Sequence, residues 1–178
     1  MLPWYQQKLT LSYFQFRAVR AGKSTIIKIL TGKYNFTNKD YEMTQGVELY
    51  DKTLESYGHT MDVVLVDTAG HQLYKWLLNS ICDENAFYAL CFDFTNKDSL
   101  GVLQAHFEQL KIKKSVLIGC KYDLQSRHTI SLADAEEFAT NNNLKLHLTS
   151  AVAFVTNFKL FPLRVYFYRC TPKSIRRS

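Results

Sequence analysis

The sequence predicts an α/β fold in which a mostly parallel central sheet is flanked by helices on both faces. Two observations lead to this prediction. First, short apolar segments of strand length alternate along the chain with segments that have helical periodicity. Second, polar residues follow directly after several of the apolar segments, which is where ligand-binding residues lie in doubly wound parallel sheets.

The N-terminal part of the chain contains one predicted helix and one predicted strand. Residues 22–25 (Gly-Lys-Ser-Thr) open a helix that is expected to run through residue 30, and the polar residues of 32–40 predict a loop after it. The apolar run 61–66 predicts a buried central strand. Residues 1–16, by contrast, bear little resemblance to a first strand.

The middle of the chain continues the alternation of strands and helices. Residues 86–94 and 115–120 are apolar and predict two further buried strands. Between them, residues 99–111 carry apolar side chains at helical spacing and predict a helix.

The C-terminal part contains two more predicted helices and a short strand. Ser131 and Asp134 resemble a capping box that opens a helix to about residue 140. Residues 144–148 alternate between apolar and polar and predict a strand. A final helix is expected within 155–170.

The composition is that of an ordinary globular protein, with one domain expected to span residues 1–178. The chain is 47% hydrophobic and 21% charged, and it contains no apolar run of about 18 residues that could span a bilayer. No signal-peptide pattern opens the sequence, so a cytosolic compartment is expected. The four cysteines lie far apart without a C-x-x-C pair and are expected to be reduced thiols.

Charge is unevenly distributed along the chain, whose net charge is +6. Residues 1–39 and 138–178 contain no Asp or Glu, so both ends are basic. Basic ends can attract anionic lipid or nucleic acid, but scattered Lys and Arg ordinarily serve solvation, and no nucleic-acid partner is expected. Eight residues follow Cys170, so the sequence has no C-terminal prenylation box and no lipid anchor is expected.

A phosphate-binding motif is indicated at the start of the first helix. A Walker A loop has the pattern G-x-x-x-x-G-K-[ST], in which backbone N–H groups cradle the phosphates, the Lys neutralises their charge and the hydroxyl holds magnesium. Gly22, Lys23 and Ser24 match the second half of this pattern, whereas Arg17 occupies the position of the first glycine. Taken alone, such a short string also occurs by chance at helix starts and in surface loops.

A second candidate site follows the strand 61–66, at residues 67–70 (Asp-Thr-Ala-Gly). Asp67 is suited to hold magnesium through water, and the N–H of Gly70 is suited to contact a γ-phosphate. The alternative interpretation is a plain strand-to-turn junction.

Residues that can read a guanine base follow two later strands. The Asp123 carboxylate can accept hydrogen bonds from the guanine N1 and N2 groups, which adenine cannot supply, and the Lys121 stem can cover the ring face. Ser150 and Ala151 close the last strand and can offer a backbone amide to the guanine O6. The phosphate, magnesium and base-reading motifs therefore occur in the same order along the chain as in a P-loop small-GTPase fold, and their order predicts that fold.

Residues 41–49 (Tyr-Glu-Met-Thr-Gln-Gly-Val-Glu-Leu) resemble the switch I segment of Rab-related proteins, and more narrowly of the Rab-like small GTPases of the intraflagellar-transport B complex. Residues 66–75 and 89–96 strengthen this resemblance, which covers about 21–151 and leaves both ends atypical. The resemblance implies a domain that binds GTP or GDP with Mg²⁺, and it places Thr44 at both the nucleotide and the metal.

The resemblance also implies a heteromeric complex. Members of this branch pair with a small β-sandwich subunit and join other intraflagellar-transport B proteins, so the expected location is the cilium or flagellum and the cytoplasm. The family has Asn where this chain has Cys120, and Rab proteins have Gln where it has His71. His71 is the one candidate catalytic residue, as a proton donor or a group that orients water; the alternative is a loop histidine with neither role.

The expected function is that of a guanine-nucleotide-binding subunit of the intraflagellar-transport B complex, with weak or no GTP hydrolysis. Two alternatives stay open, namely a vesicle-trafficking Rab-type GTPase and a nucleotide-free pseudo-GTPase scaffold. The magnesium ligands are expected to be Ser24, Thr44 and, through water, Asp67. The expected nucleotide-binding residues are Ala21, Gly22, Lys23, Ser24, Thr25, Thr44, Gly70, Cys120, Lys121, Asp123, Ser150 and Ala151.

Overall fold

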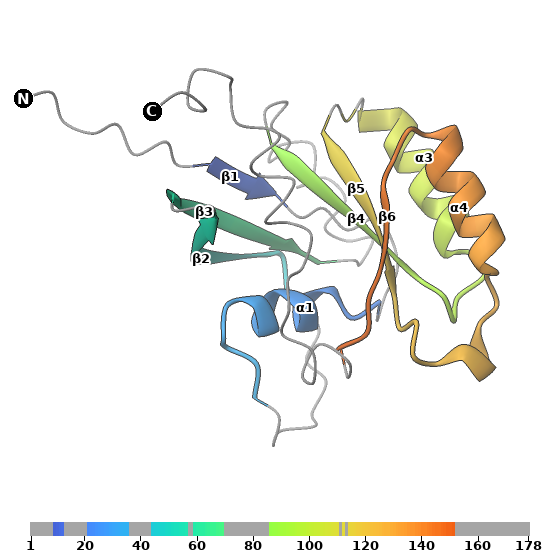
Figure 1. Cartoon of the computed structure of the whole chain (residues 1–178), viewed down its shortest axis with the longest axis horizontal. Coiled ribbons are helices and arrows are strands. Elements are labelled where there is room, and N and C mark those ends of the chain that lie inside the picture. Colours follow the sequence, from blue (N-terminus) through green and yellow to red (C-terminus); the bar gives the residue numbers. More distant parts are fainter. Residues whose placement is uncertain are drawn as a thin grey trace, which may run out of the picture.

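The strands that the structure describes form one six-stranded sheet. A computed structural model describes residues 9–12, 21–35, 44–56, 59–69, 86–110, 112 and 114–151. Within these residues, the order across the sheet is β2-β3-β1-β4-β5-β6, and every neighbouring pair is parallel except the antiparallel pair β2–β3 (Figure 1). The predicted mostly parallel sheet is confirmed. The strands are β1 (Leu9–Ser12), β2 (Val47–Ser56), β3 (His59–Thr68), β4 (Phe87–Asp93), β5 (Ser115–Cys120) and β6 (Leu146–Leu148).

The helices lie on both faces of this sheet. Helix α1 (Lys23–Leu30) covers one face, whereas α3 (Ser99–Leu110) and α4 (Leu132–Asn141) cover the other (Figure 1). A short 3-10 helix, η2 (Gln125–Arg127), follows β5. The two-faced arrangement predicted from the sequence is therefore confirmed.

Strand β4 is buried on both sides and separates two apolar cores. Phe87, Ala89 and Cys91 point into the core under α1, while Tyr88 and Leu90 point into the core under α3 and α4. Because successive side chains of a strand point to opposite faces, an uninterrupted apolar run is what a strand covered by helices on both sides requires.

Strand β1 corrects the expectation that residues 1–16 bear little resemblance to a first strand. Residues 9–12 lie at the centre of the sheet, between β3 and β4, and pair in parallel with both. The pairing partners decide this conformation, because strand formation depends more on neighbouring strands than on local residue preference.

Strand β2 is an addition to the predicted elements. It pairs with β3 along its whole length, from Val47 opposite Thr68 to Ser56 opposite His59. Along β2 exposed polar residues such as Asp51 and Thr53 flank positions of lower exposure. A polar edge strand of this kind lacks the apolar run by which the central strands were predicted.

Helix α4 begins with the capping box expected from the sequence. The Asp134 N–H donates to the Ser131 Oγ, and the Ser131 N–H donates to the Asp134 carboxylate, both at 3.1 Å. At its other end, Leu144 donates its N–H to the Ala139 carbonyl and so completes the helix terminus instead of opening the strand, which begins only at residue 146. The expected helix within 155–170 lies outside the described residues.

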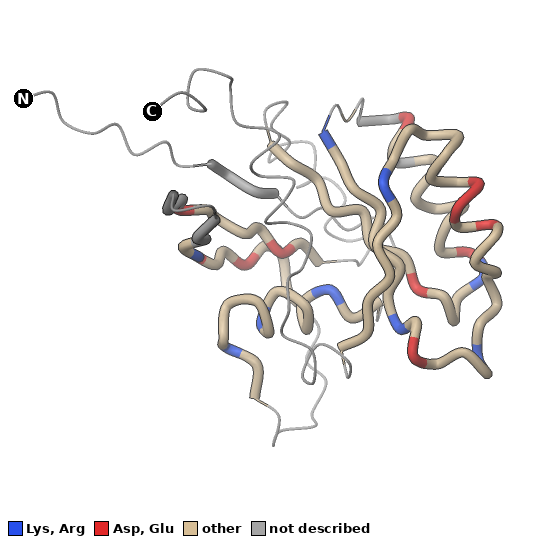
Figure 2. Tube along the Cα trace, viewed as in Figure 1, with Lys and Arg blue, Asp and Glu red and all other residues tan. Residues whose placement is uncertain are grey.

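Lys and Arg are spread over several elements of the described chain, and exposed acidic residues lie on α4 (Figure 2). In this part of the chain no helix is long and apolar enough to cross a membrane. Cys91 and Cys120 are buried free thiols, in agreement with the prediction for these two cysteines.

Gly119 allows two phenylalanine rings to pack against the end of β5. The Phe92 and Phe94 rings are fully buried, with centroids 4.8 Å apart. A Cβ atom at residue 119 would collide with the Phe94 ring and would lie 2.9 Å from Phe92 Cζ. The absence of a side chain at this position is therefore a packing requirement.

The variant Gly119→Ala is expected to lower the free energy of unfolding by about 1–3 kcal/mol, because the added methyl group overpacks the core. Urea denaturation followed by circular dichroism measures this change. Gly101→Ala in α3 is the matched control, since a Cβ there meets no atom within 4 Å. It should leave stability unchanged or raise it by up to about 1 kcal/mol, the usual gain from replacing glycine in a helix; equal midpoints for both variants would contradict the packing argument.

Candidate nucleotide-binding site

The N-terminus of α1 has the geometry of a phosphate-binding site. Gly22 precedes the helix with a φ of 83°, in the left-handed region that favours glycine, and its carbonyl accepts the Ile26 N–H at 3.0 Å. The N–H groups of the first helical turn have no partner within an α-helix and carry the positive end of its dipole. Here the first turn includes Lys23, Ser24 and Thr25, the residues expected at the phosphates.

Lys23 brings a desolvated positive charge to this site. Burial lowers the pKa of its ammonium group below the ordinary value, while the carboxylate of Asp67 opposes the shift. The positive charge of Lys121 makes a smaller contribution in the same direction as burial and also lowers the pKa of Lys23. An anion placed beside Lys23 would relieve the cost of burying this charge.

The three expected magnesium ligands converge. The Ser24 and Thr44 hydroxyl oxygens are 2.7 Å apart, and the Thr44 hydroxyl donates to Asp67 Oδ2 at 3.2 Å. Ser24 comes from α1, Asp67 from β3, and Thr44 from the segment that leads into β2. Residues 20 or more positions apart in the chain therefore meet at one point.

Backbone pairing explains how these residues meet. Glu48 is paired with Asp67 in the β2–β3 register, and beyond it the Ala69 N–H donates to the Gly46 carbonyl at 2.8 Å. This pairing carries Thr44 across the end of β3 toward α1. The edge strand that the sequence did not predict thus positions one of the predicted ligands.

The oxygen atoms gathered here fit a magnesium ion. Mg²⁺ prefers hard oxygen ligands and is commonly held by one or two carboxylates together with water and phosphate. Burial raises the pKa of Asp67, and hydrogen bonds from Ser24 and Thr44 together with the charge of Lys23 oppose the rise. A buried carboxylate with two hydroxyl neighbours is therefore available to a cation.

The expected base-reading residues lie in two loops that are joined by backbone hydrogen bonds. The Tyr122 N–H donates to the Thr149 carbonyl at 3.2 Å, and the Thr149 N–H donates to the Gly119 carbonyl at 2.8 Å. These bonds bring Asp123 and the buried Ser150 to the same edge of the sheet, with the half-buried Ala151 next to it. Asp123 itself is exposed, so its carboxylate is accessible to a base.

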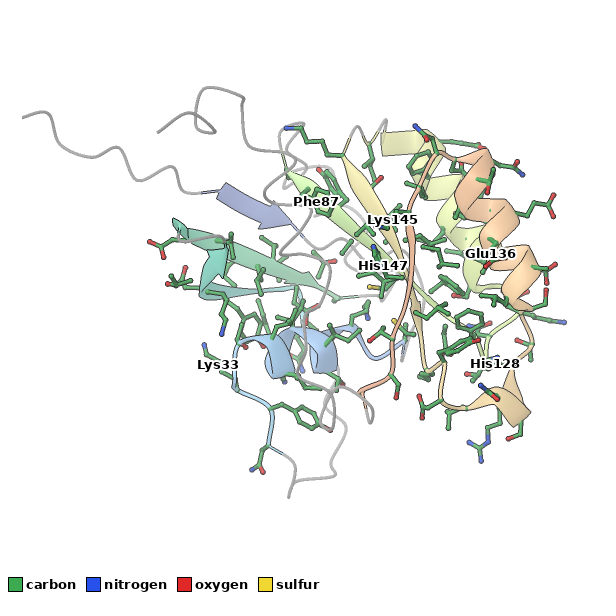
Figure 3. All side chains as sticks on the ribbon, in the orientation of Figure 1. Lys33, Phe87, His128, Glu136, Lys145 and His147 are labelled. Atoms are coloured by element: carbon green, nitrogen blue, oxygen red, sulfur yellow. The ribbon has the colours of Figure 1, made fainter. Side chains whose placement is uncertain are left out.

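Aromatic packing supports the loop that carries Asp123. Tyr122 packs edge-on against Phe94 at 5.2 Å between centroids, and His128 stacks on Phe94 at 4.8 Å. His128 lies just after η2, beyond the end of β5 (Figure 3). Tyr122 therefore anchors the loop from its position between Lys121 and Asp123.

Cys120 lies deeper than the other base-side residues. It is 2% exposed and packs under α1 beside Cys91. The Cys91 side chain and burial raise the pKa of the Cys120 thiol well above its usual range, so the group is neutral. The structure thus places this residue next to the base loop with its side chain in the core.

Asp93 is a site residue that the sequence interpretation missed. It ends β4, lies opposite Cys120 in the β4–β5 register, and accepts a hydrogen bond from Lys121 Nζ at 2.7 Å. The sequence could have indicated this residue, because a charged side chain at the end of a buried apolar strand requires a hydrogen-bond or ion-pair partner.

A second missed group surrounds Tyr50 on β2. Its hydroxyl donates to the Glu48 carboxylate, and the Lys33 ammonium lies 5.0 Å from the centre of its ring (Figure 3). Burial, followed by the Glu48 carboxylate, raises the pKa of Tyr50 well above its usual value. The group links the segment that follows α1 to β2.

The remaining predicted residues cannot be placed. Gly70 and the catalytic candidate His71 lie outside the described residues, as does Arg17 at the start of the phosphate loop. The roles given to them stay predictions.

Comparison with known proteins agrees with this geometry. A family model described as "Ras family" matches residues 18–161. "Intraflagellar transport protein 27" of Chlamydomonas reinhardtii is 33% identical over 141 residues, which cover 73% of this chain and 69% of the relative. The Mus musculus "Intraflagellar transport protein 27 homolog" is 26% identical over 137 residues, 72% and 74% of the two chains.

A plant relative is also similar. "Ras-related protein RABA4d" of Arabidopsis thaliana is 31% identical over 156 residues, 83% of this chain and 69% of the relative. The matched region contains the phosphate, magnesium and base sides of the site together, and the chain belongs to the Ras family of small GTPases.

Proposed function

We propose that this protein is a Rab-like guanine-nucleotide-binding subunit of the intraflagellar-transport B complex and acts in ciliary assembly or cargo transport. The observation that carries the proposal is the 33% identity to an intraflagellar transport protein across 73% of the chain. The meeting of Ser24, Thr44 and Asp67 adds a site of the kind that such a GTPase needs.

The proposed ligand is GTP or GDP with Mg²⁺. The N-terminus of α1 and Lys23 would hold the phosphates, and Ser24, Thr44 and Asp67 would hold the metal, Asp67 through water. When bound, the ion neutralises charge on the phosphate oxygens. Asp123 would distinguish guanine from adenine by accepting hydrogen bonds from N1 and N2.

The proposed assembly is a heteromeric complex with a small β-sandwich subunit and other intraflagellar-transport B proteins, in the cilium or flagellum and the cytoplasm. The similarity to intraflagellar transport proteins from an alga and from mammals supports this assignment. The second candidate function is vesicle trafficking, which the similarity to the plant Ras-related protein favours.

The two candidate functions predict different partners. Affinity purification of the tagged chain from ciliated cells is expected to recover intraflagellar-transport B proteins in stoichiometric amounts, including a small β-sandwich subunit. Mass spectrometry of the eluate provides the measurement, with a tagged vesicle-trafficking Rab protein as control. Recovery of endosomal or Golgi tethers in their place would favour the trafficking function.

Guanine selectivity is expected to depend on Asp123. Loss of hydrogen bonds to a charged group costs about 1.5–3 kcal/mol each, so Asp123→Ala, which removes two of them, should weaken GDP binding by roughly a hundredfold or more and leave ADP binding unchanged. Calorimetric titration gives both dissociation constants. Glu136→Ala, which removes an exposed acid on α4, is the matched control (Figure 3). Equal and weak binding of guanine and adenine nucleotides by the unmodified chain would contradict this prediction and favour the scaffold alternative.

Intrinsic GTP hydrolysis is expected to be very slow or absent. Hydrolysis requires a group that orients the attacking water, and His71 stands where Rab proteins have Gln; Val19 is also expected to crowd the γ-phosphate. Single-turnover assays should give a wild-type rate below roughly 10⁻⁴ s⁻¹, the order of unassisted Ras-type hydrolysis, and His71→Gln should raise it. A wild-type rate at or above that order would show that His71 or Gln72 orients water.

A further inference from the structure

The Asp93 side chain is a buried carboxylate whose two oxygens both have partners, which is more than a residue that only ends a strand requires. Its side chain is only 5% exposed at the end of the apolar strand β4. Oδ1 accepts hydrogen bonds from the Thr95 N–H at 2.9 Å and the Thr95 hydroxyl at 2.7 Å. Oδ2 forms an ion pair with Lys121 Nζ at 2.7 Å.

Burying a carboxylate at the end of a strand costs desolvation free energy. Replacing a buried ion pair by well-packed apolar residues is often neutral or stabilising, so such a pair is weak support for a role in stability alone. A neutral side chain with one acceptor oxygen could accept the two hydrogen bonds that Thr95 donates. Only a negative charge, however, can balance Lys121.

Lys121 needs such a partner because of where it lies. Its φ is 59°, a left-handed conformation unusual for a residue with a side chain, and it is one residue from Tyr122 and two from Asp123. Its ammonium group is also an electrostatic neighbour of Lys23, and the two positive charges repel each other. The Asp93 carboxylate counters this repulsion and holds the Lys121 ammonium at the end of β4.

We propose that Asp93 is a positioning residue for guanine-nucleotide recognition: its buried carboxylate fixes the Lys121 side chain so that the stem covers the base while the ammonium stays away from Lys23. The proposal rests on the guanine-nucleotide binding proposed above. Asp93 acts through Lys121 and does not itself contact the nucleotide.

The test is a double-mutant cycle on GDP affinity. Asp93→Asn keeps the size of the side chain and an acceptor for Thr95 but removes the charge, and Lys121→Met keeps the stem but removes the ammonium. Each single change is expected to weaken GDP binding at least tenfold. The double variant should be no weaker than the weaker single variant, because both changes break the same interaction.

Asp62→Asn is the matched control, because Asp62 also accepts a hydrogen bond from a threonine hydroxyl, that of Thr53 at 2.8 Å. It lies toward the start of β3, five residues before Asp67, and should leave GDP affinity within about twofold of wild type. Thermal unfolding without nucleotide is measured for every variant. A purely structural role would change unfolding temperature and leave the dissociation constant of the folded fraction unchanged.

Two results would overturn the inference while the proposed function stands: GDP affinity of Asp93→Asn within threefold of wild type, or fully additive losses in the double variant. Failure of the wild-type chain to bind GDP or GTP at all would overturn both. If Asp93→Asn does not fold, Lys121→Met breaks the pair from its more exposed side. It is then expected to lower GDP affinity at least tenfold, and a wild-type GDP affinity would contradict the role of the pair.

Discussion

The burial of β4 on both faces is the constraint on which the rest of the structure depends. Its alternate side chains fill one core under α1 and another under α3 and α4, so the strand fixes the distance between the two helical layers. Because β3, β4 and β5 run in the same direction, their carboxyl ends meet at one edge. Asp67, Asp93 and Lys121 lie at those ends, and α1 delivers Lys23 to the same edge.

Much of this arrangement could be predicted from the sequence, since the buried strands are uninterrupted apolar runs and the ligand residues follow them directly. The capping box at Ser131 was also visible, because it depends on residues three positions apart. Strands β1 and β2 were missed, since their pairing with β3 comes from distant parts of the chain. The partnership of Asp93 with Lys121 was missed for the same reason: 28 positions separate them, and only the β4–β5 register brings them together.

The site gathers charges that would be unfavourable without a ligand. Lys23 and Lys121 are neighbouring cations, and Glu48 raises the pKa of Asp67 through its own negative charge. A bound phosphate would offset the positive charge of Lys23, and a divalent cation would offset the two negative charges.

On the base side of the site, Cys120 stands where related proteins have an asparagine that contacts the guanine base. Cys120 is a neutral thiol in the core, so the replacement removes about one net hydrogen bond, on the order of 0.5–1.5 kcal/mol. In the proposed mode of binding, the carboxylate of Asp123 and the stem of Lys121 would remain to contact guanine. Both follow directly from the end of β5, where Gly119 admits the phenylalanine rings that hold the loop. With one fewer contact to the base, the proposed guanine affinity would depend more strongly on how firmly Asp93 fixes Lys121, since a mobile side chain must lose its conformational entropy on binding.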